Sequence, residues 1–549
     1  MSQNRSTRFI PLIIAISVVV GIVLGTFYAH HFSGNRLNII NTTSNKLNDM
    51  LHMVDDQYVD TVDLSDLVER ALPQILGELD PHSIYIPAKD SQQANDELAG
   101  SFSGIGVQFT IRQDTIHINN VVKGGPSEKV GLLAGDRIIK VDDEEFTGKI
   151  VTNDEAMRRL KGEKGSKVKL TVLRRGQKDL LDFTVVRGDI PVNSLKASYM
   201  IDNEIGYMQI EKFGETTYPE MLVALAKLSQ ANFKGLIIDL RGNTGGYMGA
   251  AIQMVNEFLP SNRLIVYTEG RKSARQEYRS DGRGSYQNLP LAVLVDEGSA
   301  SASEIFAGAI QDNDRGMVVG RRSFGKGLVQ EQVEFGDHSL LRLTIARYYT
   351  PSGRCVQKPY KKGHDKDYEM DFLTRYERGE FFSEDSIKLT GEQYETSIGR
   401  KIYGGGGIMP DHFVPQDTTS MTSYYRMAVN LGLIIQYAYE YTDDNRQKLN
   451  KFSDSESLQK YLAKQNVVEQ FASYAEKKGL KRRNLMLQKS MKLFERALYG
   501  NIIYIMLDDE EYAKYINESD PTVLKAVELF KKDAIWPQAP DKKEEAKKK

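Results

Sequence analysis

The chain of 549 residues contains a single cysteine, Cys355. One thiol excludes a disulfide framework within the chain and a zinc site built from several thiolates. Cys355 follows a Ser-Gly-Arg run that is typical of a turn. We therefore interpret it as a structural or incidental thiol rather than a nucleophile.

The sequence also lacks an excess of positive charge. Lysine and arginine total 72 residues, aspartate and glutamate total 74, and the formal net charge is −2. A general nucleic-acid-binding protein carries a basic excess, so this balance argues against nucleic acid as a partner. Hydrophobic residues make up 40% of the chain, which is normal for packed globular structure. The length predicts about three or four domains.

One long apolar run is present, from Phe9 to Ala29, and Arg5 and Arg8 precede it. About 20 apolar residues suffice to span a bilayer, and flanking arginines keep the amino terminus inside the cell. The sequence therefore predicts a cytoplasmic tail over residues 1–8 and a transmembrane signal anchor over residues 9–29. A cleaved signal peptide is the alternative, although Phe27 and Ala29 make a poor cleavage site. Under either interpretation the rest of the chain is exported.

Helical patterns flank the middle of the chain. Residues 41–99 show apolar residues at helical spacing, and we predict a small helical amino-terminal domain there. Its turn from Leu79 to Tyr85 contains His82, which has no second metal ligand at helical or strand spacing and is interpreted as structural. Residues 416–549 are predicted to be helical and to end in a charged Lys/Glu tail.

Short alternating strands with glycine turns begin near residue 100. Residues 100–187 resemble a PDZ domain, most clearly in the turn 126–132 and the Gly-Asp-Arg-Ile stretch that starts at Gly135. In that family a glycine-flanked loop offers N–H groups to the carboxylate of a peptide, and the adjoining strand edge pairs with the peptide. The resemblance places Gly104, Ile105, Gly106 and Val107 in this loop.

Residues 188–415 have the pattern of an α/β core. The runs 236–240 and 291–295 are almost continuously apolar, which indicates strands that are buried on both faces of a sheet. A glycine-rich loop, residues 242–246, follows the first of these strands. Only part of a phosphate-binding glycine pattern is present in it, so nucleotide binding is weakly supported.

Three serines follow the second strand, at a predicted helix start. Ser301 and Glu304 form a capping-box pattern, which by itself explains a serine at this position. The alternative is a nucleophile, because a helix start supplies free N–H groups and a positive dipole end. The amide of Ala302 would then hold the oxyanion formed by attack of Ser301. Gly245 or Gly246 would supply a second donor, since glycine permits close approach of the backbone.

Lys326 lies between two glycines, before an alternating pattern over residues 326–333. If these residues form a strand, Lys326, Leu328 and Gln330 share one face. Burial lowers the pKa of a lysine and allows it to act as a base, and Gln330 can orient the amine without adding a charge. An exposed lysine on a glycine turn is the alternative from these residues alone.

The chain resembles the carboxy-terminal processing, or tail-specific, serine proteases over roughly residues 45–415. The motifs that carry the resemblance are GSASASEI (298–305), FGKGLVQ (324–330) and YYTPSGR (348–354). The resemblance implies Ser301 as the nucleophile, Lys326 as the base and Gln330 as the partner of the lysine. It also implies an α/β fold with a crotonase/ClpP-like protease core and an inserted PDZ-like domain, without a metal or a cofactor.

These inferences predict a membrane-anchored endopeptidase that captures unstructured, apolar protein carboxyl termini and cleaves by a Ser/Lys mechanism. We expect it in a bacterial inner membrane with its catalytic part facing the periplasm. A homo-oligomer or an adaptor is left open as a partner. The alternative from another class is a non-catalytic PDZ scaffold that binds the tails of envelope proteins. A crotonase-type acyl-thioester enzyme would need a coenzyme site, and the sequence shows no basic pocket pattern for one.

Overall fold

A computed structural model of the chain describes residues 19–20, 35–112, 114–363, 365–388 and 391–540. The chain divides into two compact units, Met1–Leu76 and Gly77–Lys549. Two long helices, α2 (Asn35–Gln57) and α3 (Leu64–Gly77), account for most of the described first unit. None of the described helices combines the length and the apolar character that crossing a membrane requires. The predicted tail and anchor, residues 1–29, lie outside the described residues apart from Val19 and Val20.

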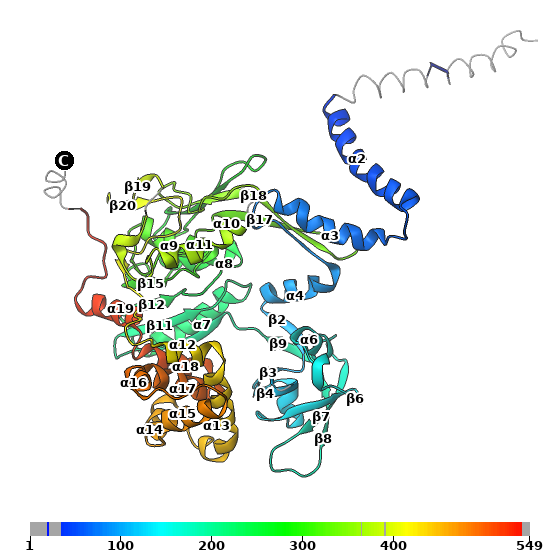
Figure 1. Cartoon of the computed structure of the whole chain (residues 1–549). Coiled ribbons are helices and arrows are strands. Elements are labelled where there is room, and N and C mark those ends of the chain that lie inside the picture. The colour runs from blue at the N-terminus through cyan, green and yellow to red at the C-terminus, as the bar shows by residue number, and fades with distance from the viewer. Residues whose placement is uncertain (1–18, 21–34, 113, 364, 389–390, 541–549) are drawn as a thin grey trace, which may run out of the picture. The chain divides into compact units, whose positions relative to one another are not determined.

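The PDZ-like region of the second unit is an antiparallel sheet in the order β3-β4-β5-β7-β8, with β6 paired to β5 (Figure 1). Among the described strands β3 has one partner, so its other edge is open. Strands β2 and β9 pair with each other in a separate ribbon. β2 comes before this sheet in the chain, and β9 comes after it. The bounds are β2 (Ser101–Gly104), β3 (Val107–Arg112), β4 (Thr115–Val121), α5 (Pro126–Val130), β5 (Arg137–Val141), β6 (Glu144–Glu145), α6 (Asn153–Leu160), β7 (Lys167–Leu173), β8 (Leu181–Val186) and β9 (Gly188–Pro191).

The core contains a sheet in the order β10-β11-β12-β15-β16-β21, parallel from β11 onward and antiparallel at β10. β12 and β15 consist entirely of buried residues, in agreement with their apolar runs. Helices α7, α8 and α9 pack on one face. The α/β fold class is confirmed. The bounds are β10 (Leu195–Met200), β11 (Ile205–Ile210), α7 (Thr217–Gln230), β12 (Gly235–Asp239), α8 (Met248–Asn256), β15 (Leu291–Val295), α9 (Ala302–Asp312), β16 (Met317–Gly320) and β21 (His412–Phe413).

A second sheet of the core has the order β1-β18-β13-β14, and β17 forms a hairpin with β18. Its strand β1 comes from within the predicted helical domain 41–99. The first unit ends at Leu76, and Ile84–Ile86 pairs with β18 because its β-branched and aromatic residues favour a strand. The bounds are β1 (Ile84–Ile86), α4 (Ala88–Ala99), β13 (Leu264–Glu269), β14 (Gln276–Arg279), β17 (Leu328–Glu334), β18 (Leu340–Tyr349), α10 (Asp365–Glu369), α11 (Asp371–Glu377), β19 (Gln393–Glu395) and β20 (Lys401–Tyr403).

The carboxy-terminal region is helical, and most of its helices share a separate hydrophobic core. The last helix, α19, instead covers the second face of the central sheet, where Val523 and Ala526 pack with Ile237 and Leu294 (Figure 1). Residues 416–549 therefore include one element that completes the protease core. The bounds are α12 (Ser423–Asn430), α13 (Leu433–Leu449), α14 (Ser455–Ala463), α15 (Val467–Lys477), α16 (Asn484–Lys489), α17 (Met491–Met506), α18 (Asp509–Asn517) and α19 (Pro521–Lys531).

Candidate active site

Ser301 is at the amino end of α9, in the turn that follows β15. Its backbone has φ 56° and ψ −114°, a region that a residue with a side chain occupies only under strain of about 1–3 kcal/mol. Among the described residues the N–H of Ala302 donates no hydrogen bond, as expected in the first turn of a helix. The turn therefore presents a hydroxyl beside a free N–H at the positive end of a helix dipole.

The other two serines of the motif fasten this turn to the glycine loop. The hydroxyl of Ser299 donates to the carbonyl of Leu240 at 2.7 Å, and that of Ser303 donates to the carbonyl of Asn243 at 2.8 Å. Both hydroxyls are fully buried. Their contacts define structural roles, and they leave Ser301 as the serine of the three that lines a cavity.

Glu304 joins the serine segment to the lysine segment. It completes the predicted capping box, because its carboxylate accepts from the N–H of Ser301 at 2.9 Å. The same carboxylate accepts from the N–H groups of Gly325 at 2.7 Å and Lys326 at 2.8 Å, and from the hydroxyl of Ser323. Its side chain is fully buried, and burial raises its pKa to about 7. One carboxylate thus sets the spacing between two segments that are distant in sequence.

Lys326 lies in a loop just before β17, rather than on the strand that the pattern 326–333 predicted. A register shift between Val329 and Gln330 bulges this strand, which turns the Gln330 side chain toward the lysine. The amine Nζ of Lys326 donates to Oε1 of Gln330 at 2.9 Å. Burial, followed by the positive charge of Arg342, lowers the pKa of Lys326 below its ordinary value.

Ser301, Lys326 and Gln330 line one cavity of about 490 Å³. The hydroxyl of Tyr348, on β18, contacts the backbone carbonyls of both Ser301 and Lys326. Tyr348 is almost fully buried, so this contact persists away from competing water. Ala302 and Gly246 also line this cavity.

The glycine loop approaches the serine closely. Gly245 has φ 104°, and a side chain added to it would lie 2.7 Å from Cβ of Ser301. Its N–H is already used, because it donates to Oδ1 of Asn243 at 2.9 Å. The N–H of Gly246 donates no hydrogen bond within the described part of the chain. Of the two glycines predicted as oxyanion donors, Gly246 is therefore the one with an available N–H.

Sequence reasoning did not find the contribution of the turn at Asp80–Ser83. The amide Nε2 of Gln330 donates to the backbone carbonyl of His82, and Nε2 of His82 is 2.9 Å from the hydroxyl of Tyr368. Burial and the neighbouring Lys326 lower the pKa of His82 to about 4. The available signal was a polar Asp-Pro-His-Ser run between apolar stretches, which does not reveal its partner 248 positions away.

The predicted peptide-binding loop connects β2 to β3. The carbonyls of Ile105 and Gly106 accept from Ser127 at 3.0 Å and Val122 at 3.0 Å, while their own N–H groups donate to no described residue. Gly106 has φ 75°, which glycine adopts without strain. Val107 begins β3, the strand with an open edge. The loop thus presents two free N–H groups next to an unpaired strand edge.

The described residues contain no group of three or more His, Cys, Asp or Glu side chains arranged to hold a metal ion. The groups that line this site include a hydroxyl, a buried amine and free backbone amides. Such groups can perform acyl transfer when the amine is neutral.

Family models match three segments of the chain. Residues 204–370 match peptidase family S41, and residues 103–185 match the PDZ domain. Residues 424–508 match a family of unknown function, DUF8443. The first two matches cover the core strands with the serine and lysine motifs and the PDZ-like sheet.

Carboxy-terminal processing proteases match more than half of the chain. A carboxy-terminal-processing protease of Bartonella bacilliformis is 37% identical over 318 residues, which is 57% of this chain and 72% of that protein. The carboxy-terminal processing protease CtpB of Bacillus subtilis is 34% identical over 57% of this chain and 65% of its own length. Among solved structures, a photosystem II D1 C-terminal processing protease is 26% identical, covers 56% of this chain and 89% of its own, and has a TM-score of 0.32.

Proposed function

Because the chain belongs to peptidase family S41 and is a carboxy-terminal processing serine protease with a PDZ domain, we propose that Ser301 is its nucleophile and Lys326 its general base. The observation that carries this proposal is the shared cavity of Ser301, Lys326 and Gln330, in which burial lowers the pKa of the lysine. A neutral amine has a lone pair that can accept the proton of a hydroxyl. Gln330 accepts one N–H of this amine and so orients it.

In the proposed reaction, Lys326 takes the proton of Ser301 while the serine oxygen attacks the scissile carbonyl. The negative oxygen of the tetrahedral intermediate is held by the N–H groups of Ala302 and Gly246, which is worth several kcal/mol in comparable sites. The protonated lysine then donates its proton to the leaving amine. The same lysine then takes a proton from water as the water oxygen attacks the acyl-enzyme, and it returns that proton to the oxygen of Ser301 as the carbon–oxygen bond breaks.

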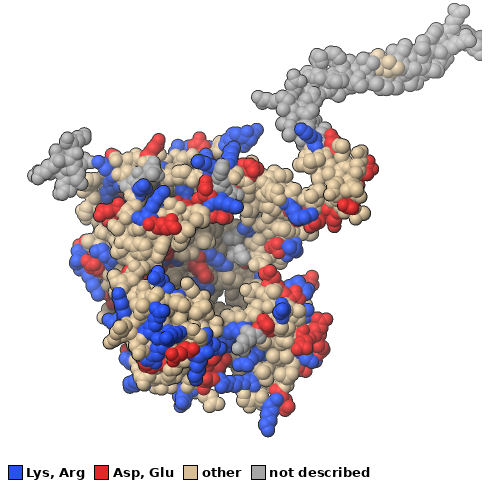
Figure 2. Space-filling view, viewed as in Figure 1, with Lys and Arg blue, Asp and Glu red and all other residues tan. Residues whose placement is uncertain are grey.

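We also propose that the loop 104–107 and the open edge of β3 capture an unstructured, apolar carboxyl terminus. The free N–H groups of Ile105 and Gly106 suit a terminal carboxylate, and the edge of β3 suits strand addition. Acidic and basic side chains alternate over the visible face of the second unit (Figure 2). Such an alternation favours recognition through backbone and apolar contacts rather than through a field of one sign.

For the location of the protein, we propose a bacterial inner-membrane anchor over residues 9–29 with the catalytic part in the periplasm. The support is the apolar sequence from Phe9 to Ala29 and the preceding Arg5 and Arg8. Membrane fractionation of the full chain and of a variant without residues 1–29 tests this. Release of the truncated protein into the soluble fraction is expected, and a full chain that is already soluble contradicts the anchor. Light scattering of the purified protein decides whether it forms a homo-oligomer, and co-purification decides whether it binds an adaptor, the two partners left open by the sequence.

Replacement of each reacting group tests the mechanism. Ser301→Ala and Lys326→Ala should each abolish cleavage of a protein with a flexible apolar tail. Lys234→Ala, which removes a lysine from an exposed ion pair with Glu204, is the matched control and should keep full activity. A purified Ser301→Ala or Lys326→Ala protein that cleaves at the rate of the unaltered chain refutes the assignment of that residue.

A further inference from the structure

The orientation of the Gln330 amide decides whether the lone pair of the Lys326 amine stays available to accept a proton. An amide has an oxygen that accepts and a nitrogen that only donates. With Oε1 toward Lys326, the amine donates to the glutamine and its lone pair stays available for the proton of Ser301. In the flipped orientation the NH₂ group would donate to that lone pair and occupy it.

The backbone carbonyl of His82 fixes this orientation, because it accepts from Nε2 of Gln330 and cannot donate. Asp80 in turn holds the carbonyl in place. Its Oδ1 accepts from the N–H groups of His82 and Ser83, both at 2.9 Å, and its Oδ2 accepts from the hydroxyl of Ser83 at 2.6 Å. The turn is therefore closed by one carboxylate that is 6% exposed.

The same turn is tied to the strand that faces Gln330. Thr344, on β18, pairs with Gln330 on β17. Its hydroxyl donates to Oδ1 of Asp80 at 3.0 Å, and its N–H donates to the hydroxyl of Ser83 at 3.1 Å. Thr344 thus connects the turn that carries the His82 carbonyl to the strand that carries Gln330.

We propose that Asp80 is a positioning residue for the reaction: through the His82 carbonyl it holds the Gln330 amide with its oxygen toward Lys326. The proposal rests on the proposed Ser/Lys function. It adds a residue that acts on the reacting atoms only through other groups of the protein. Asp80 also raises the pKa of Lys326 through its negative charge, against the stronger effect of burial. Its geometric and electrostatic effects can therefore be separated by substitution.

A double-mutant cycle between Asp80→Ala and Gln330→Ala tests the proposal. Each single change should lower kcat by about 10- to 100-fold with little change in KM, because neither side chain is assigned to substrate binding. The double variant should be no slower than Gln330→Ala alone, since the turn acts through that amide. Losses that multiply in the double variant overturn the proposal.

Two further variants separate positioning from general loss of structure. Asp80→Asn keeps an oxygen for the two N–H groups, so most of kcat should return while the acid limb of the pH profile moves to lower pH. Asp202→Ala is the control. It removes a carboxylate that closes a similar turn, in which Oδ1 of Asp202 accepts from the N–H groups of Glu204 at 3.0 Å and Ile205 at 2.9 Å. It should leave kcat unchanged. If Asp80→Ala does not fold, Thr344→Val replaces it in the cycle with the same expected non-additivity.

The experiments distinguish failure of the positioning role from failure of the Ser/Lys function. One outcome rejects the positioning role alone. In it, Ser301→Ala and Lys326→Ala are inactive, but the losses of kcat from Asp80→Ala and Gln330→Ala multiply in the double variant. Full activity of Lys326→Ala rejects the Ser/Lys function and the positioning role with it. An unshifted acid limb in Asp80→Asn, together with a low kcat, also overturns the positioning role, because it shows that the turn matters without reaching Lys326.

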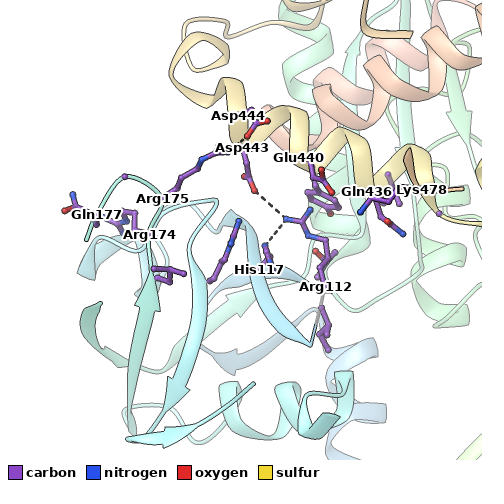
Figure 3. A pocket seen from close by; sticks show the side chains of 18 residues that line it. Arg112, His117, Arg174, Arg175, Gln177, Gln436, Glu440, Asp443, Asp444 and Lys478 are labelled. Atoms are coloured by element: carbon purple, nitrogen blue, oxygen red, sulfur yellow. Dashed lines mark hydrogen bonds and ion pairs between the residues drawn. The ribbon is translucent and has the colours of Figure 1, made fainter. Parts of the chain in front are cut away.

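A second inference comes from a cavity of about 1010 Å³ between the PDZ sheet and the carboxy-terminal helix α13 (Figure 3). Arg112, the last residue of β3, crosses it. Its NH2 is 3.6 Å from Oδ2 of Asp443, and its guanidinium is 4.5 Å from the centre of the Tyr439 ring. Arg175 forms a second ion pair across the cavity, with Asp444.

Opposite charges gather on the two sides of this cavity. The PDZ side contributes cationic residues together with His117, and α13 contributes carboxylates (Figure 3). Nδ1 of His117 accepts a hydrogen bond from Arg112 at 2.8 Å, and burial together with the charge of Arg112 lowers the pKa of His117 to about 4. A neutral His117 therefore accepts from Arg112 and aims it at α13. The charged residues that line the cavity are Arg112, Arg137, Arg174, Arg175, Glu440, Asp443, Asp444 and Lys478.

The strand that carries Arg112 is also the strand proposed to receive a peptide. β3 starts at Val107 in the binding loop and ends at Arg112 in the ion pair, six residues in all. A strand of this length spans roughly 17–20 Å, so the loop and the ion pair lie at opposite ends of one short strand. The ion pairs of Arg112 with Asp443 and of Arg175 with Asp444 form a clasp, and the first of them is attached to the end of the peptide-binding strand.

We infer that the carboxy-terminal helices of residues 424–508 are a docking domain that holds the PDZ domain through this clasp. The inference does not depend on which residues perform catalysis. The Arg112 and Asp443 side chains are 18% and 13% exposed, so water screens this pair less than an exposed one. Raising the ionic strength should nevertheless loosen the clasp, chiefly at the exposed Arg175–Asp444 pair.

Hydrogen exchange of the full chain tests the clasp. Asp443→Asn combined with Asp444→Asn should speed exchange in β3, β4 and the turn 174–177 by several-fold at low ionic strength, and leave α9 unchanged. Glu456→Gln removes a carboxylate from an exposed pair with Lys460 elsewhere in the same helices and is the matched control. A charge exchange, Asp444→Arg with Arg175→Asp, should restore slow exchange that Asp444→Arg alone loses. Unchanged exchange in the double Asn variant, or no restoration by the charge exchange, overturns the inference.

Discussion

Gly245→Ala is the substitution for which the structure gives the most direct expectation. The added Cβ would lie 2.7 Å from Cβ of Ser301, 2.8 Å from the carbonyl oxygen of Ala300 and 3.0 Å from the N of Ala302. Ordinary carbon contacts are about 3.5–4.0 Å, so the serine turn or the glycine loop must shift by the order of 0.5–1 Å. The backbone at φ 104° adds strain that glycine avoids.

Two magnitudes follow for Gly245→Ala. Strain of about 1–3 kcal/mol and overpacking of about 1–3 kcal/mol should together lower the free energy of unfolding by roughly 2–6 kcal/mol. A misplacement of about 1 Å in a reacting group costs on the order of 100-fold in rate, so kcat should fall by about that factor. Chemical denaturation measures the first quantity, and steady-state cleavage of a protein with an apolar tail measures the second.

Gly242→Ala is the matched control in the same loop. Gly242 also has a left-handed backbone, with φ 69°, but an added Cβ meets nothing within 4 Å. It should lose about 1–2 kcal/mol of stability from strain alone and keep its kcat. A Gly245→Ala protein with a kcat within about threefold of the unaltered chain would refute the reasoning, because the close approach to Ser301 would then have no effect on the reaction.

Three further predictions concern buried ionisable groups. Cleavage should increase with pH through the lowered pKa of Lys326, and a pH profile of kcat/KM with its acid limb near pH 4, where His82 titrates, would contradict a lysine base. Glu304→Gln replaces an accepting oxygen with a donating NH₂, so a buried N–H of the Ser301 or Lys326 segment loses its acceptor and the free energy of unfolding should fall by about 1–3 kcal/mol in chemical denaturation. His82 has a folded-state pKa of about 4 against 6.5, so the folded state resists protonation and the free energy of unfolding should decrease as pH falls from 6.5 to 4. In denaturation curves His82→Asn should show a smaller decrease over that range, and an equal decrease would contradict the assignment.

Much of the architecture could be read from local patterns. The apolar runs of β12 and β15 are long enough to indicate strands buried on both faces, and both are buried throughout. The serine motif indicated a capped helix start, and α9 begins at Ala302 with that capping box. These features depend on neighbouring residues in the chain, so periodicity and capping chemistry suffice to find them.

Other features depend on pairings that no local pattern contains. The prediction placed Lys326 on a strand face with Gln330, whereas the structure brings them together from a loop and across a bulge. Glu304 was predicted as a cap, and its second function, to accept from the lysine segment, appears only when residues 304 and 325–326 meet. The predicted amino-terminal domain 41–99 also divides, because β1 finds its partner in β18.

By itself the sequence determined the residue types that the proposed chemistry needs: a serine at a helix start, a lysine between glycines, a neutral glutamine and a flexible glycine loop. These are properties of local sequence, and the resemblance of the motifs that contain them pointed to the protease family. Only the tertiary structure decided which amides are free, which carbonyl orients Gln330 and why burial lowers the pKa of Lys326. Those properties depend on desolvation and on hydrogen bonds between segments that are distant in sequence, and both are established only when the chain has packed.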